Sequence, residues 1–382
     1  MKLTTSILLL TVVLSSCSSA EKSKTIVWNN QTKLPANADG SSHLGLAGPV
    51  AGMMGDKLLI AGGANFPGKM PWDGGAKQYA TETYIYQLEN GVLTFLTQSE
   101  LKEAIAYPGN CSVGQILYVA GGENESGAVK SVKKFSLKGN TLQEESLPDL
   151  PLALTNGSLV FASNKLYFVG GENQQLVSDK IYRLDLSAEN MVWEEAFTLA
   201  HPVSNAVVVS DKKNKLYIAG GRMRNTDSLS TIYNQLFEVD LPSGSINKIT
   251  DLPQPTAAGT GIWDDDGHIL LFGGDHAETF HRVEALIAQI NQTTDASWRN
   301  TLIEEKAVLQ RQHPGFSSHT WSFNVVQKKW KKQDDIIGES PVTTTALRHQ
   351  NSVIIPSGEI RAGVRTDQIL VGHMKNKEHD EK

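Results

Sequence analysis

Leu117-Tyr118-Val119-Ala120-Gly121-Gly122 is a short apolar run that ends in two glycines, and this pattern recurs along the 382-residue chain. The other intact copies end at the pairs Gly62-Gly63, Gly170-Gly171, Gly220-Gly221 and Gly273-Gly274, and a degenerate copy ends at Ser357-Gly358. In the intact copies, successive first glycines are 49 to 59 residues apart. The chain is therefore a repeat protein, and the repeat rather than the length sets its domain count.

A period of about 50 residues with a double glycine is typical of the kelch repeat, in which each copy forms one four-stranded blade of a β-propeller. In the third copy we expect strands near residues 159–161, 166–169 and 181–186, with Trp193 in the fourth. Residues 181–186 alternate between two kinds of side chain, as expected for a strand with two different faces. The sequence predicts an all-β, six-bladed kelch-type β-propeller over residues 25–374.

The two chain ends complement each other. Residues 26–28, followed by Leu34-Pro35, resemble the fourth strand of a blade, with no first three strands before them. The sixth copy stops after its third strand, at residues 366–371, and a charged tail follows at 375–382. We expect the N-terminal strand to complete the last blade, which leaves no free sheet edge.

One segment, residues 275–318 in the fifth copy, breaks the period. It carries apolar residues at helical spacing, namely Phe280, Val283, Leu286, Ile287 and Ile290. This indicates a helical insertion in blade five that either packs against the propeller flank or caps a pocket. Long structured loops are more often functional, which favours the cap.

The N-terminus resembles an export signal. Residues 1–16 read as a signal peptide with a lipobox, and Cys17 follows Leu14-Ser15-Ser16 directly. The alternative is an ordinary signal peptide with an incidental cysteine. We expect Cys17 to be lipidated, residues 17–24 to be a linker, and the protein to be membrane-anchored in a bacterial cell envelope, on the periplasmic side or the cell surface.

Charge and motif spacing argue against several partners. The net charge of −6 provides no basic surface for nucleic acid. Gly63 to Lys69 has the spacing of a phosphate loop, but Met70 replaces the required Ser or Thr. Asp275, His276 and His281 have no further ligand at metal-site spacing, so pocket lining or helix capping is the simpler interpretation. We expect no metal and no cofactor.

Residues just after the double glycines leave the same face of a propeller and converge on its axis, where a small-molecule site is expected. The candidate binding residues are Asn65, Glu123, Glu172, Arg222, Asp275 and His276. For Glu123 and Glu172 the sequence does not decide between lining the pocket and capping a turn.

The degenerate sixth copy carries the strongest candidates, Glu359 at the end of its second strand and Arg365 at the start of its third. A carboxylate there can act as a general base if burial raises its pKa, and a guanidinium can clamp a substrate carboxylate at two points. The alternative is a structural ion pair, and spacing alone does not decide between the two.

Several stretches resemble the cyclically permuted mutarotases related to N-acetylneuraminate epimerase. They are Gly62-Gly63-Ala64-Asn65-Phe66-Pro67 with Met70-Pro71-Trp72 and Gly75, Gly338-Glu339-Ser340-Pro341, and Gly358-Glu359 with Gly363-Val364-Arg365-Thr366-Asp367. The resemblance runs from about Trp28 to Val371, with a rotated blade order that a closed ring tolerates. The lipobox and a shorter loop at residues 64–80 depart from the family.

The resemblance implies a function and roles for two residues. It implies a mutarotase that interconverts the α and β anomers of N-acetylneuraminate, a sugar acid, with Glu359 as the proton acceptor and Arg365 beside it, holding the substrate carboxylate. The alternative is a non-catalytic kelch propeller that binds glycans or proteins.

Overall fold

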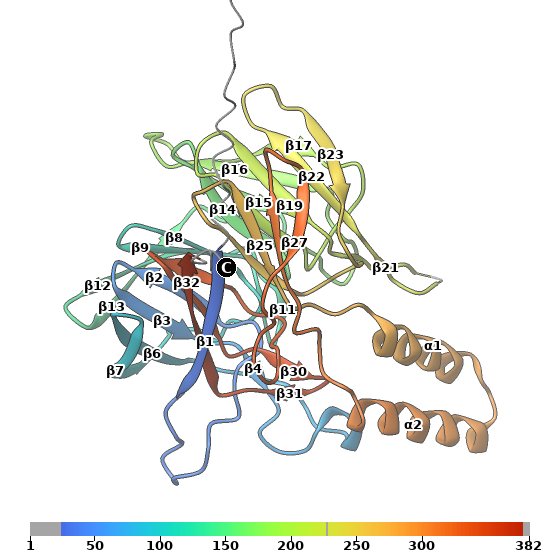
Figure 1. The fold of residues 1–382 in the computed structure, drawn as a ribbon. Helices are drawn as coiled ribbons and strands as arrows, with labels where there is room; N and C mark the ends of the chain where they lie inside the picture. Colours follow the sequence, from blue (N-terminus) through green and yellow to red (C-terminus); the bar gives the residue numbers. More distant parts are fainter. Residues whose placement is uncertain (1–23, 227, 377–382) are drawn as a thin grey trace, which may run out of the picture.

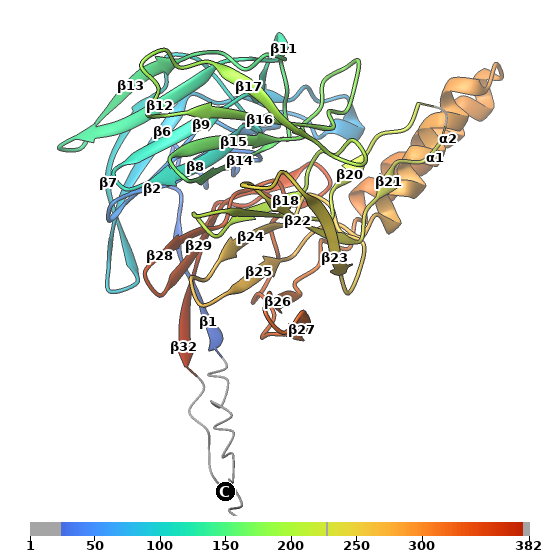
Figure 2. The ribbon, with the colours of Figure 1, turned by 90° about the horizontal axis from the view of Figure 1, so that it is seen from above.

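The computed structural model describes residues 24–226 and 228–376. Six four-stranded antiparallel sheets are arranged as blades around a central axis (Figures 1 and 2). The predicted six-bladed propeller is therefore confirmed.

The blades follow the repeats in order. The first three blades are β2 (Val50–Met54), β3 (Lys57–Ala61), β6 (Glu82–Glu89) and β7 (Val92–Glu100); β8 (Gly109–Val113), β9 (Ile116–Ala120), β12 (Val132–Lys138) and β13 (Thr141–Leu147); and β14 (Ser158–Ala162), β15 (Lys165–Val169), β16 (Lys180–Asp185) and β17 (Trp193–Thr198). The last three are β18 (Val207–Ser210), β19 (Lys215–Ala219), β22 (Gln235–Asp240) and β23 (Ile246–Asp251); β24 (Thr260–Trp263), β25 (His268–Phe272), β26 (Thr320–Asn324) and β27 (Lys329–Lys332); and β28 (Leu347–His349), β29 (Ser352–Pro356), β32 (Gln368–Asn376) and β1 (Lys24–Lys33).

Short hairpins follow the second strand of four blades. They are β4 (Ala64–Asn65) with β5 (Gln78–Tyr79), β10 (Glu123–Asn124) with β11 (Gly127–Ala128), β20 (Arg222–Met223) with β21 (Thr231–Ile232), and β30 (Glu359–Arg361) with β31 (Val364–Arg365). A 3-10 turn, η1 (Pro71–Asp73), lies in the loop between β4 and β5.

After its first residue, the second strand of each blade is apolar, because both of its faces are buried between neighbouring blades. In β19, Leu216 and Ile218 pack toward blade three, whereas Tyr217 and Ala219 pack toward blade five. The same division produces six hydrophobic clusters, one at each contact between adjacent blades. The core is therefore a ring of interfaces between blades.

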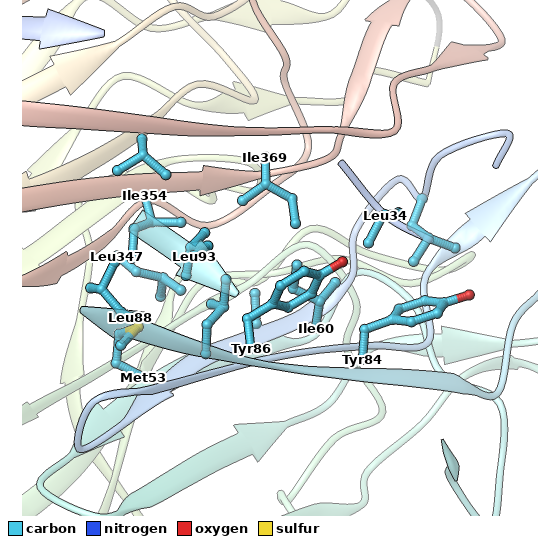
Figure 3. Close-up of a cluster of buried hydrophobic side chains, with 14 residues drawn as sticks. Leu34, Met53, Ile60, Tyr84, Tyr86, Leu88, Leu93, Leu347, Ile354 and Ile369 are labelled. Carbon is cyan, nitrogen blue, oxygen red and sulfur yellow. The ribbon is translucent and has the colours of Figure 1, made fainter. Parts of the chain in front are cut away.

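Strand β1 closes the ring by pairing antiparallel with β32 along the outer edge of blade six. Figure 3 shows the apolar cluster that joins this blade to blade one, with Ile354 and Ile369 on one side and Ile60 and Tyr86 on the other. The expectation that the N-terminal strand completes the last blade is confirmed.

The glycine pairs allow the backbone to turn where the blades crowd together. Gly121 has φ of 63°, and a Cβ added there would lie 2.3 Å from the carbonyl oxygen of Leu154 in the approach to the next blade. Gly122 donates its N–H to that same carbonyl at 2.8 Å. A side chain is excluded at Gly121 by both conformation and space.

A circle of backbone hydrogen bonds surrounds the axis. In each blade, one residue near the axis adopts a left-handed conformation, and its N–H donates to the carbonyl oxygen of its counterpart in the preceding blade at 2.6–3.1 Å. These residues, named here the axial ring, are Gly48, Tyr107, Asn156, Asn205, Ala258 and Thr343. Five of them carry a side chain, although this conformation favours glycine.

The fifth blade contains the expected helical insertion, α1 (Glu278–Gln292) and α2 (Ala296–Arg311). The helices pack on each other and project outward from the propeller (Figures 1 and 2). They neither lie along the flank nor extend across the axis, so neither predicted placement is right for the hairpin as a whole. Only its base approaches the axis, as described below. Within the described residues, no helix has the length and apolar character needed to span a membrane.

Candidate functional site

The residue that follows the double glycine occupies an equivalent position in every blade. Each forms an antiparallel bridge with a residue just before the first strand of its own blade. The residues in these positions are Ala64, Glu123, Glu172, Arg222, Asp275 and Glu359. Their equivalence places five of the candidate residues, Glu123, Glu172, Arg222, Asp275 and Glu359, on one face of the propeller.

A cavity of about 380 Å³ opens on this face, above the axial ring. This volume falls within the range of about 300–1,000 Å³ typical of small-molecule sites. The base of the insertion contributes much of its wall, with Thr279, Phe280, Val283, Gln310, His313 and Phe316. The predicted capping role of the insertion is therefore limited to its base.

Glu359 lines the cavity and is the best-placed general base. Its Oε1 accepts a hydrogen bond from the backbone N–H of Gly363 at 2.7 Å, and 19% of its side chain is exposed. Burial raises the pKa of Glu359 above its ordinary value of 4.5, while Arg365 and the Gly363 N–H act in the opposite direction. A carboxylate in this state can exchange protons with a bound ligand.

Arg365 lies behind Glu359 and does not border the cavity. Only 4% of its side chain is exposed, and its Nη2 is 3.8 Å from Oε2 of Glu359. Its Nε donates to the carbonyl oxygen of Ala64 at 3.2 Å, and its guanidinium lies over the ring of Phe66. The arginine is therefore placed to influence the charge of Glu359, and it has little free surface with which to clamp a substrate.

Arg222 lines the cavity, with 20% of its side chain exposed, and forms an ion pair with Glu172. The Nη2 of Arg222 is 2.6 Å from Oε1 of Glu172, which also accepts hydrogen bonds from Asn156 and Asn205. Glu172 is buried behind Arg222 rather than in the cavity wall. It neither lines the pocket nor merely caps a turn, because it fixes an arginine.

Asp275 and His313 lie on the cavity wall at the two ends of the insertion. Oδ1 of Asp275 accepts the N–H of Ala277 at 2.7 Å. Burial lowers the pKa of His313 below its ordinary value of 6.5, while the negative charge of Asp275 raises the same pKa and offsets part of this effect. Gly315 donates its N–H to Nδ1 of His313 at 3.1 Å, so the neutral ring carries its proton on Nε2.

Three predicted binding residues lie away from the cavity. Asn65 donates to the carbonyl oxygen of Gly45 at 3.1 Å, and Glu123 pairs with Lys77 and accepts from the hydroxyl of Tyr79 at 2.9 Å. Nδ1 of His276 lies 2.8 Å from the carbonyl oxygen of Pro255. These side chains form contacts with neighbouring loops and are not part of the cavity wall.

Other sequence candidates have ordinary surroundings. In residues 24–226 and 228–376, His, Cys, Asp and Glu side chains form no cluster suited to a metal ion. His281, considered above with Asp275, contacts the carbonyl oxygen of Ser230 at 2.8 Å. Cys111 is the other cysteine of the chain besides Cys17, and burial raises the pKa of its thiol to about 12, which disfavours the nucleophilic thiolate. Cys17 lies outside the described residues.

The sequence prediction missed His313, Phe280, Asn156 and Asn205 as cavity residues. The two asparagines are 49 residues apart, which is the repeat period, and each lies 14 or 15 residues before the double glycine of its blade. That recurrence is a signal that could have identified them. No comparable signal exists for His313, because it lies in the insertion, outside the repeat.

Comparison with protein families gives a match over most of the chain. The family model for N-acetylneuraminate epimerase matches residues 15–143 and 147–382. The N-acetylneuraminate epimerase of Haemophilus influenzae (strain 86-028NP) is 34% identical over 229 residues, which cover 60% of this chain and 59% of that protein. The enzyme of the same name from Salmonella typhi is 23% identical over 226 residues, covering 59% and 57%.

The aligned part thus spans less than two thirds of these relatives. The solved structure of YjhT superposes with a TM-score of 0.61 at 16% identity, covering 90% of this chain and 99% of that one. At this identity the superposition shows a shared fold.

Proposed function

Because the chain belongs to the N-acetylneuraminate epimerase family, we propose that it is an isomerase that interconverts the α and β anomers of N-acetylneuraminate in the axial cavity. The observation that carries this proposal is the position of Glu359, a carboxylate with a raised pKa on the wall of a cavity of about 380 Å³. The proposed site contains the one group that the reaction requires, a base that can also return a proton.

The reaction moves one proton between two oxygens on the same carbon. Glu359 takes the proton from the anomeric hydroxyl, whose oxygen becomes the ketone oxygen as the bond from the anomeric carbon to the ring oxygen breaks. The electron pair of that bond stays on the ring oxygen, which takes the proton back from Glu359. Rotation about the adjacent carbon–carbon bond and the reverse steps then close the ring on the other face.

His313 is suited to stabilise the ring oxygen during opening. Its Nδ1 is occupied by Gly315, so its Nε2–H is the available donor on the cavity wall. A neutral imidazole that donates a hydrogen bond stabilises the negative charge that develops on the leaving oxygen. The lowered pKa of His313 keeps the ring neutral at physiological pH.

Arg365 has a supporting role in this mechanism. Its positive charge lowers the pKa of Glu359 and so partly offsets the effect of burial on the same group. Without this arginine, the carboxyl would remain protonated to a higher pH and would act as a base only above that pH.

Proton NMR of freshly released α-N-acetylneuraminate tests the proposal. Catalytic amounts of the protein should bring the α and β signals to the same final ratio as buffer alone, but faster. An unchanged rate would exclude the mutarotase activity. Binding of the sugar without a change in rate would instead favour the non-catalytic, glycan-binding alternative.

We also propose that the protein is attached to a membrane in a bacterial cell envelope through lipidated Cys17. The support is the sequence Leu14-Ser15-Ser16-Cys17 after an apolar run. Metabolic labelling with a fatty acid should label the wild-type protein and not the Cys17→Ser variant. Absence of label in both would exclude the anchor.

A further inference from the structure

The charges on the cavity wall restrict where a substrate carboxylate can lie. Among the described residues that line the cavity, Arg222 is the one permanent cation, whereas Asp275 and Glu359 are carboxylates. Arg365 is 4% exposed and lies behind Glu359. A bound carboxylate is therefore repelled from the side of the cavity formed by blades five and six and attracted to Arg222 in blade four.

Arg222 is held in place before any ligand binds. Oε1 of Glu172 is 2.6 Å from Nη2 of Arg222, and the same oxygen accepts from Asn156 at 3.2 Å and from Asn205 at 3.5 Å. Three donors on one oxygen fix the carboxylate, and the carboxylate fixes the guanidinium. A binding group that is already ordered loses less conformational entropy when its ligand arrives.

The insertion contributes to the same arrangement through α1. Phe280, in the first turn of this helix, lies with its ring 5.4 Å from the guanidinium carbon of Arg222. An aromatic face against a guanidinium stabilises the cation and leaves the edge of its plane for hydrogen bonding. This contact gives the base of the insertion a role in the site.

Arg222 retains unused donors. Its guanidinium makes one hydrogen bond to the described residues, to Glu172, and its Nε is buried without a partner. A guanidinium offers five N–H donors in a planar fork that matches a carboxylate. The donors that a ligand in the cavity can reach are those on the exposed part of the guanidinium, since 20% of the Arg222 side chain is exposed and Arg222 lines the cavity.

We propose that Arg222 binds the carboxylate of the sugar acid, with Glu172 and Phe280 as its positioning residues. The inference rests on the proposed function and adds the basis of its selectivity for acidic over neutral sugars. With the carboxylate at Arg222, the adjacent anomeric carbon lies between blade four and Glu359. The role that the sequence suggested for Arg365 thereby belongs to Arg222.

Calorimetric titration with equilibrated N-acetylneuraminate and with its methyl ester tests the inference, because the ester removes the charge and keeps the ring. The Arg222→Gln variant should raise Kd for the acid by about 10- to 100-fold, as expected for loss of a charge-assisted hydrogen bond. Its Kd for the ester should change much less.

Arg224→Gln is the matched control, since it removes the same charge two residues away, where Arg224 binds backbone carbonyls in an exposed loop. It should leave Kd for the acid unchanged. Because Arg222→Gln leaves Glu172 without its partner, the double variant Arg222→Gln with Glu172→Gln provides a neutral version of the site. This double variant should also bind the acid more weakly than the wild type does, with a much smaller change in Kd for the ester.

The outcomes separate this inference from the proposed function. If the wild type accelerates mutarotation but both Arg222 variants bind the acid as tightly as it does, the inference is wrong and the function stands. If the wild type neither binds the acid nor accelerates the reaction, both are overturned. If the variants are folded and lose affinity for the acid but not for the ester, the inference is supported.

Discussion

Oε2 of Glu359 and Nη2 of Arg365 are 3.8 Å apart, which is beyond hydrogen-bond length, while Oε1 of the same glutamate accepts the N–H of Gly363 at 2.7 Å. The arginine therefore acts on Glu359 mainly through its charge, whereas the N–H of Gly363 holds the carboxylate in place by a hydrogen bond. These two effects can be separated by experiment.

The activity should rise with pH in a single step. Glu359 must be ionised to act, and its pKa is raised above 4.5 because it is buried. The midpoint of the rise should therefore lie above 4.5, and activity should stay level at pH values above the rise because His313 is then uncharged. Rates of mutarotation between pH 4.5 and 8.5, corrected for the spontaneous reaction, measure this profile, and a fall on the alkaline side would contradict the role given to His313.

Arg365→Gln should move the same midpoint to higher pH. The arginine lowers the pKa of Glu359, so its removal leaves burial unopposed by that charge. Activity near the wild-type midpoint should fall, with recovery as the pH increases. A lower rate at all pH values with an unmoved midpoint would show that Arg365 acts in another way.

Glu359→Gln should reduce the catalysed rate by about 10²- to 10⁴-fold, the usual contribution of a general acid or base. The amide keeps the shape of the side chain but cannot accept the proton. Glu145→Gln, at an exposed glutamate of blade two, is the control and should leave the rate unchanged. Full activity of Glu359→Gln would remove this residue from the mechanism.

Gly363→Ala should lower kcat by roughly 10- to 100-fold through misplacement of Glu359. Gly363 has φ of 76°, and an added Cβ would lie 2.9 Å from Cγ of Pro71 in η1. Gly139 has φ of 64° with no atom within 4 Å of such a Cβ. Gly139→Ala therefore introduces the same backbone strain far from the cavity, and equal effects of the two substitutions on kcat would refute a positional role.

Trp28→Ala should destabilise the protein by about 3–5 kcal/mol, the usual cost of removing a buried large aromatic. Trp28 is 7% exposed and packs edge-on against Phe272 of blade five at 5.7 Å. Urea unfolding measures the change, and Val27→Ala is the control on the same strand because Val27 is 48% exposed. A similar decrease in the free energy of unfolding for both variants would indicate that the contact of Trp28 with Phe272 contributes little to stability.

The fold was largely predictable because the sequence of each repeat contains the pattern that defines one blade. The second strand, such as residues 166–169, is apolar on both faces and ends at a glycine pair, and both features are local in sequence. Ring closure was also predictable, since each chain end lacked what the other supplied. The outward direction of α1 and α2 was not, because helical spacing defines which face is apolar and does not define where the hairpin points.

The site was predictable only in part, because the local sequence does not define the direction of its side chains either. The repeat identifies six equivalent positions, but each side chain there can point toward the axis or into its own loop. Arg222 and Glu359 line the cavity, whereas Glu123 is held by Lys77 and Tyr79 from the neighbouring blade. That difference depends on contacts between residues far apart in sequence.

The axial ring has a consequence for the closure of the propeller. Each of its residues donates to one neighbour and accepts from the other, so Gly48 and Thr343 are joined in the same way as the other five neighbouring pairs. Opening the ring between blades one and six would leave the N–H of Gly48 and the carbonyl oxygen of Thr343 unpaired at the axis, each costly to bury. The circle therefore adds a second closure to the one made by β1, because it ties the first blade to the last at the centre of the molecule.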